Sequence, residues 1–290
     1  MLLLKLFLFF SFFSSTFSHD LHPLPRPLII QYPEGIETHF HEFDDELKSQ
    51  CTSWRFAVEA NNLSPWKTIP EECLGYVKDY MTGRGYEMDL ERVSKEAGVY
   101  ANTLELSGDG KYVWIFDIDE TLLSNLPYYV EHGYGLEIFD PIEFDKWVQR
   151  GTAPAIEPSL QLYEKVLDLG FKIFLLTGRN EQHRSITIEN LTKAGFRRWD
   201  KLILRNAFSY PAGIVVTDVN RGLIPVTIVL CRGREHHGKL ATVFKSEKRS
   251  EMVEEGYRIL GNSGDQWSDL PGAAASSRSF KLLNPMYYIP

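Results

Sequence analysis

Two carboxylates at alternate positions, Asp117 and Asp119, follow directly on an apolar run at residues 112–116. A short run rich in aromatic and β-branched residues predicts a buried strand. Charged side chains are rarely buried without a metal ion or an opposite charge, and parallel sheets bind ligands at the carboxyl ends of their strands. We therefore predict a metal and phosphate site here, with Asp117 as a carboxylate nucleophile. The alternative is a plain strand-to-helix turn capped by Asp119.

A second apolar run, at residues 171–176, ends in Thr177 and Gly178. A threonine hydroxyl can donate to a phosphate oxygen, and a glycine lets backbone N–H groups approach an anion closely. These two residues are therefore candidates for phosphate binding. Taken alone, they fit a strand followed by a helix N-cap equally well.

A fixed ammonium group would serve such a site, because phosphoryl transfer is catalysed mainly by positioning and charge neutralisation. Lys245 and Lys248 both compete for this role. The alternative for this basic segment is a solvated helix start, and that interpretation suits Lys248 and Arg249 better.

A third apolar run, which begins at Arg258, leads into a loop of small residues that carries Asp265 and Asp269. Mg²⁺ prefers near-octahedral oxygen ligands and often takes only one or two protein carboxylates. We expect Asp265 to bind such an ion directly and Asp269 to act through water. Acidic residues in a loop of this composition are otherwise ordinary turn residues.

These four stretches, in this order, resemble the motifs of the haloacid dehalogenase superfamily, whose first signature is Asp-x-Asp-x-Thr. Much of the chain is also similar to the plant acid phosphatase and vegetative storage protein family, of the class B type. The stretches that carry this similarity are residues 53–55, 59–62, 117–129, 151–155, 175–179, 257–269 and 284–288.

The resemblance implies a Rossmann-like α/β core with a parallel sheet, and a mechanism for its acids. Asp117 would form an aspartyl-phosphate, and Asp119 would protonate the leaving group and then activate water. Mg²⁺ would be held by Asp117, Asp265 and the backbone carbonyl of Asp119, with Asp269 completing the acidic set.

The resemblance also assigns the phosphate-binding groups. Thr177, Gly178 and Lys245 would hold the phosphate oxygens. The spacing in the superfamily between the lysine and the following acidic motif favours Lys245 over Lys248.

The implied function is an acid phosphatase that hydrolyses small phosphate monoesters. The alternative is a vegetative storage protein with little or no activity, since loss of the nucleophile is one way in which storage members become inactive. Asp117 is present here, which favours the enzyme. A phosphotransferase to an alcohol is a third class. A dehalogenase fits less well, because such enzymes do not require the Mg²⁺-binding acids.

Length and composition bound the rest. The chain has 290 residues, of which 43% are hydrophobic, and this suits one globular domain with a small accessory part. Its formal charge of −8 argues against a nucleic-acid partner.

Residues 1–18 have the build of a signal peptide, and no other stretch is apolar enough to span a membrane. We expect a secreted, cell-wall or vacuolar protein with no membrane contact in its mature form, and a homodimer is compatible with the sequence.

The secretory route changes how the cysteines and asparagines are interpreted. Cys51 and Cys73 are expected to form a disulfide, the alternative being two buried thiols. Asn62 and Asn190 both begin glycosylation sequons. Pro65 follows the first sequon and makes its use doubtful, and the second counts only if its helix face is exposed.

The expected domain plan has an N-terminal extension at residues 19–98 and a catalytic core at residues 99–290. Residues 19–47 are expected to form an extended lead-in, and the remainder of the extension to be mostly helical and to stabilise the core. Residues 122–157 form the expected small cap. Its many aromatic side chains suit either a leaving group stacked at the mouth of the site or a small core within the cap.

Residues 206–231 do not fit the family pattern, which passes from Arg205 almost directly to the segment beginning at Gly233. The inserted stretch is apolar, β-prone and ends in Cys231, whereas a surface loop is usually polar. We interpret it as an insert outside the evolved fold, such as a translated intron. The alternative is a genuine surface insertion, such as a substrate loop or an oligomer contact.

Overall fold

The computed structural model describes residues 39–205 and 239–290. The expected signal peptide, most of the lead-in, the insert at 206–231 and Cys231 lie outside the described residues. The expectation that the lead-in stays extended to residue 47 is wrong, because helix α1 spans His39–Glu59. No proline or glycine interrupts these residues, so nothing in the sequence stops the helix from beginning early.

One sheet of five parallel strands organises the described chain, in the order β3-β2-β1-β4-β5. The strands span Tyr112–Phe116 (β1), Lys172–Asn180 (β2), Lys201–Arg205 (β3), Arg258–Gly264 (β4) and Arg278–Lys281 (β5). Since β1 pairs with both β2 and β4, the chain winds outward from β1 in both directions. Ligands bind in the crevice at such a switch point, and Asp117 follows the end of β1.

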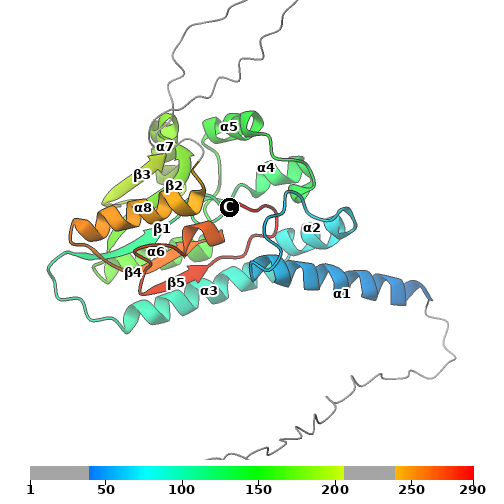
Figure 1. Cartoon of the computed structure of the whole chain (residues 1–290), viewed down its shortest axis with the longest axis horizontal. Coiled ribbons are helices and arrows are strands. Elements are labelled where there is room, and N and C mark those ends of the chain that lie inside the picture. The colour runs from blue at the N-terminus through cyan, green and yellow to red at the C-terminus, as the bar shows by residue number, and fades with distance from the viewer. Residues whose placement is uncertain (1–38, 206–238) are drawn as a thin grey trace, which may run out of the picture. The chain divides into compact units, whose positions relative to one another are not determined.

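Helices cover both faces of the sheet (Figure 1). On one face, Val113 and Ile115 of β1 belong to a cluster with Phe244 and Met252 of α8 (Ala241–Glu254). On the other face, the alternate residues Trp114 and Phe116 belong to the larger core with α3 (Arg84–Asn102), α6 (Glu157–Asp168) and α7 (Arg184–Lys193). A strand buried on both faces needs a continuous apolar run, which explains the sequence of β1.

The segment predicted to form the cap lies between β1 and α6. It contains α4 (Leu126–Glu131), the 3₁₀ turn η2 (Gly133–Gly135) and α5 (Pro141–Arg150). The N-cap residue of α5, Asp140, accepts a hydrogen bond from the backbone N–H of Ile142 at 2.8 Å. The left-handed Gly151 ends this helix, because a Cβ at that φ of 60° would be strained. A second 3₁₀ turn, η3 (Glu181–His183), joins β2 to α7.

The N-terminal extension is helical, as predicted. It comprises α1, η1 (Glu71–Cys73), α2 (Leu74–Thr82) and α3, which continues past the expected domain boundary at residue 98. A disulfide between Cys51 and Cys73 joins α1 to η1. Within the described residues, every helix is too short or too polar to cross a bilayer.

Candidate active site

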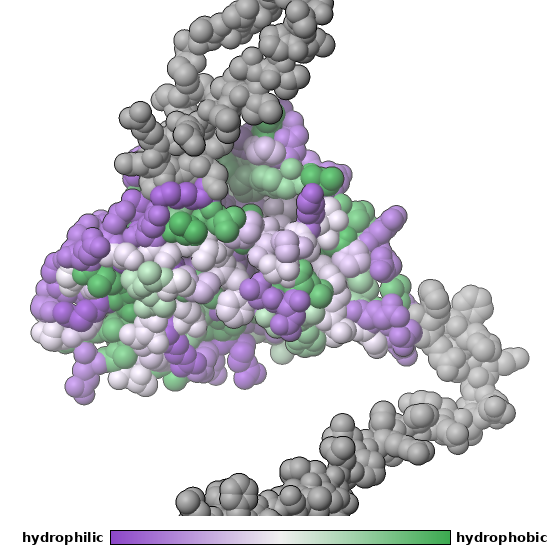
Figure 2. Space-filling view, viewed as in Figure 1, coloured by the Kyte–Doolittle hydropathy of each residue, from purple (hydrophilic) through white to green (hydrophobic). Residues whose placement is uncertain are grey.

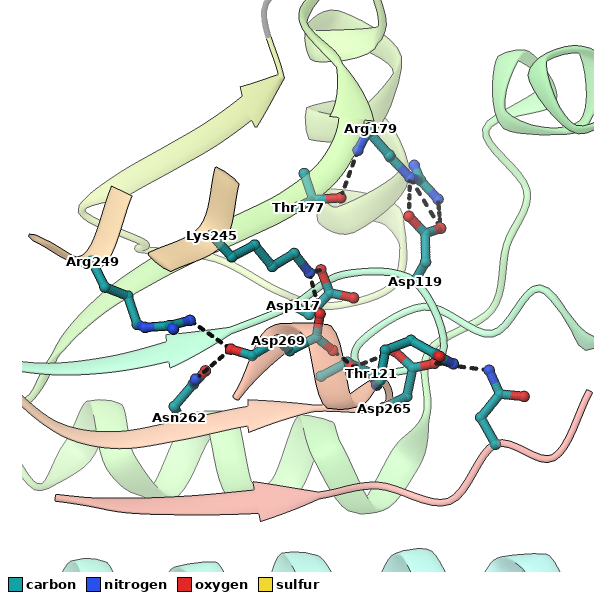
Figure 3. Close-up of polar contacts among 12 residues, drawn as sticks. Asp117, Asp119, Thr121, Thr177, Arg179, Lys245, Arg249, Asn262, Asp265 and Asp269 are labelled. Carbon is teal, nitrogen blue, oxygen red and sulfur yellow. Dashed lines mark hydrogen bonds and ion pairs between the residues drawn. The ribbon is translucent and has the colours of Figure 1, made fainter. Parts of the chain in front are cut away.

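Asp117 lies at the end of β1, with 5% of its surface exposed, and its backbone N–H donates to the carbonyl of Ser263 in the neighbouring β4. Helix α8 carries Lys245 across the same edge of the sheet. The Lys245 Nζ atom lies 2.5 Å from Oδ1 of Asp117 and 2.5 Å from Oδ1 of Asp269 (Figure 3). Asp269 ends the 3₁₀ turn η4 (Trp267–Asp269). One ammonium group therefore bridges acids from two separate motifs.

The structure separates the two candidate lysines. Lys248 pairs instead with Glu251 at 2.8 Å, on the same helix. Arg249 was expected to be solvated, and this expectation is wrong. Its side chain is fully buried and donates to the backbone carbonyls of Asp269 (2.7 Å) and Pro271. One helical turn after Lys245, Arg249 thus fixes the loop that carries Asp269.

Burial and charge set the protonation of this cluster. Burial by itself would lower the pKa of Lys245, but Asp117 and Asp269 outweigh it and raise that pKa, so the lysine stays cationic. Burial raises the pKa of Asp117 well above its usual range, against the opposing effect of Lys245. The acids at this position therefore need more positive charge than one lysine supplies.

Three acids, Asp117, Asp265 and Asp269, offer side-chain oxygens that lie within 4.8 Å of one another, and all three are buried. Burial, followed by repulsion from Asp269, raises the pKa of Asp265 to about 7. Three clustered carboxylates beside one ammonium suit a hard divalent cation, which Mg²⁺ would supply. The residues present therefore fit the metal that the sequence predicts.

The carboxylate of Asp119 lies outside this cluster. Its Oδ1 is 2.7 Å from Nη2 of Arg179, whose Nε also donates to both carboxylate oxygens, and Asn125 Nδ2 donates to Oδ1 at 2.9 Å. Burial by itself would raise the pKa of Asp119, but the charge and hydrogen bonds of Arg179 outweigh it and lower that pKa. The side chain of Asp119 is thus held by Arg179, and metal binding by its backbone carbonyl stays a prediction.

Arg179 and Asn125 are the residues that sequence reasoning missed. Arg179 follows Gly178 at the end of β2, so a cation next to the predicted phosphate-binding pair was the available signal. Asn125 is fully buried and accepts a hydrogen bond from Trp147 Nε1 at 2.9 Å, which ties the cap to Asp119. Nothing in its sequence neighbourhood distinguishes Asn125 from a loop asparagine.

The predicted phosphate-binding pair lies at the same edge. Thr177 is fully buried, and its Oγ1 accepts a hydrogen bond from the backbone N–H of Arg179 at 3.1 Å, so the hydroxyl hydrogen can still be donated. Gly178 lines the cavity, and a Cβ added there would meet no atom of the described residues within 4 Å. Its backbone is thus open to an approaching anion.

A cavity of about 490 Å³ is lined by Gly178, Lys245 and the acids Asp117, Asp119, Asp265 and Asp269, whereas the fully buried Thr177 is not among its lining residues. Its wall on the cap side includes Phe139, Phe144 and Val148, and the C-terminal segment adds Tyr287 and Ile289. Figure 2 shows a recess with hydrophobic residues between the elements labelled α5, α7 and α8 in Figure 1. A mixture of acids, cations and apolar side chains suits an organic molecule that carries a phosphate.

The aromatic residues of the cap divide between the two predicted uses. The Tyr128 ring lies 5.3 Å from Phe144 and 6.5 Å from Trp147, centroid to centroid, and these residues form a small core within the cap. Phe139 and Phe144 also line the cavity. The small core is therefore present, and the stacking of a leaving group on Phe139 and Phe144 stays a prediction.

The two sequons differ in exposure. Asn62 is exposed. Asn190 is only 3% exposed, and its amide exchanges hydrogen bonds of 2.7 and 3.1 Å with the backbone of Ala153. The condition set for this sequon, an exposed helix face, is therefore not met in the folded chain.

Several known proteins are similar to this chain in sequence or in fold. The family model described as HAD superfamily, subfamily IIIB (Acid phosphatase), matches residues 36–215 and 221–290. Acid phosphatase 1 of Solanum lycopersicum is 60% identical over 268 residues, which cover 92% of this chain and 91% of that protein. Vegetative storage protein 1 of Arabidopsis thaliana is 38% identical and covers 83% of this chain and 79% of its own length. The class C acid phosphatase from Bacillus anthracis has a similar fold, with a TM-score of 0.54 at 20% identity, and the match covers 74% of this chain and 84% of that one.

Proposed function

This chain belongs to the HAD superfamily, subfamily IIIB, the acid phosphatases, and on that premise we propose that it hydrolyses small phosphate monoesters through an aspartyl-phosphate on Asp117. The observation that carries the proposal is the Lys245 ammonium, which lies 2.5 Å from both Asp117 and Asp269 beside an open cavity. A buried carboxylate held in this way is oriented and remains close to a positive charge, as a nucleophile for a phosphoryl group requires.

In the first step, a carboxylate oxygen of Asp117 attacks phosphorus, and the bond from phosphorus to the ester oxygen breaks. Lys245, the Thr177 hydroxyl and the backbone N–H groups next to Gly178 stabilise the charge on the remaining oxygens. The departing ester oxygen takes a proton from Asp119 and leaves as an alcohol.

The proton on Asp119 needs a source, because Arg179 keeps this carboxylate ionised in the free protein. A phosphate monoester has its second pKa near about 6, so at mildly acidic pH it binds with one proton of its own. That proton can pass from the phosphate to Asp119 and then to the leaving oxygen. We therefore expect turnover to be fastest at mildly acidic pH.

In the second step, Asp119 is ionised again and accepts a proton from water as the water oxygen attacks the aspartyl-phosphate. The bond from phosphorus to Asp117 breaks, which releases inorganic phosphate and restores the carboxylate. Asp117, Asp265 and Asp269 would hold Mg²⁺, and the ion when bound would neutralise charge on the phosphoryl group and align it.

The experiment is hydrolysis of p-nitrophenyl phosphate by the purified chain at mildly acidic pH, with EDTA and with added Mg²⁺. Acid-quenched samples are digested to locate phosphate on Asp117 by mass spectrometry. We expect Mg²⁺-dependent turnover that Asp117→Asn abolishes. Lys248→Ala should preserve it, because Lys248 pairs with Glu251 and not with the acids of the site. Near-normal turnover by a folded Asp117→Asn variant would rule the mechanism out.

A storage protein is the second candidate, and the 38% identity to a vegetative storage protein favours including it. A folded wild-type chain that turns over no substrate would support it. Because the insert predicted at 206–231 lies outside the described residues, the assay is run with and without that segment. Turnover by the shortened chain alone would assign the failure to the insert rather than to the site.

We also propose that the chain enters the secretory route and reaches the cell exterior, the wall or the vacuole. The disulfide between Cys51 and Cys73 supports an oxidising compartment. Small phosphomonoesters are the proposed partners, without nucleic acid or a membrane, and light scattering of the purified chain would test for a homodimer.

A further inference from the structure

Asn284 connects the candidate metal site to the rest of the molecule. This residue is 4% exposed and follows β5. Its side-chain Nδ2 donates to Oδ2 of Asp265 at 2.8 Å, and its Oδ1 accepts from the backbone N–H of Met286 at 3.0 Å. Gln266 Nε2 donates to the same Oδ2 atom of Asp265 at 2.8 Å. Two amides therefore hold one oxygen of this acid and fix the plane of its carboxylate.

Glu59, the last residue of α1, holds Asn284 in turn. Its Oε1 accepts the backbone N–H of Asn284 at 2.8 Å, and its Oε2 pairs with Lys281 Nζ at 2.7 Å. The Glu59 side chain is only 9% exposed, so the pair is shielded from solvent. Helix α1 belongs to the N-terminal extension, and Glu59 lies 225 positions away from Asn284 in the sequence.

The same helix end also reaches the loop that carries the other acid. The backbone carbonyl of Glu59 accepts a hydrogen bond of 2.8 Å from Trp267 Nε1. Trp267 begins η4, and Asp269 ends it. One residue of the extension thus contacts the segment that holds Asp265 and the segment that contains Asp269.

We propose that Glu59 and Asn284 are positioning residues for a divalent cation, and that the N-terminal extension forms part of the metal site. Hydrogen-bonded partners behind metal ligands typically change metal affinity by about 10–100-fold when removed, because they orient the ligand. The extension therefore does more than pack on the core, which is the role that the sequence predicts for it. The inference rests on the proposed metal dependence of the phosphatase.

The test is Mg²⁺ binding to the full-length, metal-free chain by isothermal titration calorimetry, alongside kcat and KM at saturating Mg²⁺. Asn284→Leu removes the donor at nearly the same volume, and Glu59→Ala removes the acceptor. Glu59→Gln is the conservative variant, because it retains an oxygen for the Asn284 N–H. Trp267→Phe removes only the hydrogen bond from Trp267 to the backbone carbonyl of Glu59, and it keeps an aromatic ring at this position.

Glu96→Gln is the matched control. Glu96 of α3 pairs with Arg278 of β5 at 2.8 Å on the surface, so this variant also breaks an ion pair between the extension and the sheet. Among the described residues, the Glu96 side chain forms no hydrogen bond or ion pair with Asp265, Gln266 or Asn284. A general loosening of the extension would affect this control as well.

We expect Asn284→Leu and Glu59→Ala to weaken Mg²⁺ binding by about 10-fold or more, with kcat largely recovered at saturating Mg²⁺. Glu59→Gln should recover most of the affinity, and Glu96→Gln should stay within about two-fold of wild type. If Glu59→Ala fails to fold, Asn284→Leu and Trp267→Phe decide the matter. Wild-type affinity in Asn284→Leu would overturn the positioning role alone, whereas a wild-type chain that binds no Mg²⁺ would overturn the metal proposal with it.

Discussion

The guanidinium of Arg179 binds the carboxylate of Asp119 through three hydrogen bonds of 2.7 to 3.1 Å. Asp117 lies only two positions earlier in the sequence, but its carboxylate pairs with Lys245 instead. The two acids of one motif are therefore in different electrostatic surroundings. Burial raises the pKa of Asp117, whereas the charge of Arg179 overcomes burial and lowers that of Asp119. Pairs of acids whose surroundings separate their pKa values are suited to different chemical roles.

Replacing Asp119 with asparagine should slow the hydrolysis of substrates with poor leaving groups most. An alkyl phosphate needs its departing oxygen protonated, and loss of a general acid typically costs about 10²–10⁴ in rate. p-Nitrophenolate leaves without protonation, so the first step with p-nitrophenyl phosphate should lose less of its rate. The second step still lacks the base Asp119, so this substrate should release a burst of p-nitrophenolate. Rapid-quench assays with glycerol phosphate and p-nitrophenyl phosphate measure this difference. Equal losses on both substrates would exclude the acid role.

Arg179→Gln should shift the pH dependence of activity upward. Removing the guanidinium raises the pKa of Asp119, so this acid keeps its own proton to higher pH and depends less on the proton that the substrate brings. The alkaline limb of kcat/KM for an alkyl phosphate should therefore move to higher pH, while the maximum falls because charge compensation is lost. A pH–rate profile for wild type and variant measures the shift, and an unchanged alkaline limb would contradict it.

The acids at strand ends were the part of the site that sequence could predict. A continuous apolar run before Asp117 and another before Thr177 require buried strands, and parallel strands bring their carboxyl ends together. Lys245 could be chosen over Lys248 only through the resemblance to a known family. The structure is consistent with the choice, because Lys245 is buried and pairs with Asp117 and Asp269, whereas Lys248 pairs with Glu251.

Contacts between distant segments could not be predicted in the same way. Arg249 looks like a surface residue of a basic helix, and only the loop folded against α8 makes it a buried donor to Asp269. Asn284 and Glu59 lie 225 positions apart, so no local pattern of residues signals their hydrogen bond. The sheltered amide of Asn190 likewise depends on how α7 packs, which a sequon does not encode.

Metal-free protein should become less stable as the pH rises from about 4 to about 7. The pKa of Asp265 is raised from 3.8 to about 7 in the folded chain, so over this range the folded state binds more protons than the unfolded state. The free energy of unfolding then falls with increasing pH, and each kcal/mol lost lowers Tm by roughly 2–4 °C.

Mg²⁺ should reverse this trend, since it binds the ionised acids and therefore stabilises the protein more at pH 7 than at pH 5. Thermal unfolding in EDTA and in Mg²⁺ across the same pH range measures both effects. Asp265→Asn should flatten the dependence in EDTA. A Tm that rises with pH in the metal-free chain would contradict the prediction.

Phe139→Ala should weaken binding of aromatic substrates selectively. Phe139 is 49% exposed, lines the cavity, and lies 5.4 Å from Phe144 between ring centroids, so an aromatic leaving group can extend this pair. Such ring contacts are worth about 0.5–1.5 kcal/mol, which corresponds to an increase of roughly 2- to 12-fold in KM for naphthyl phosphate. KM for glycerol phosphate should hardly change, because glycerol offers no ring.

Ile138→Ala is the matched control, since Ile138 is 77% exposed next to Phe139 but is not among the residues that line this cavity. A similar rise in KM for both substrates, or for the control variant, would show that the aromatic residues serve the cap and not the substrate.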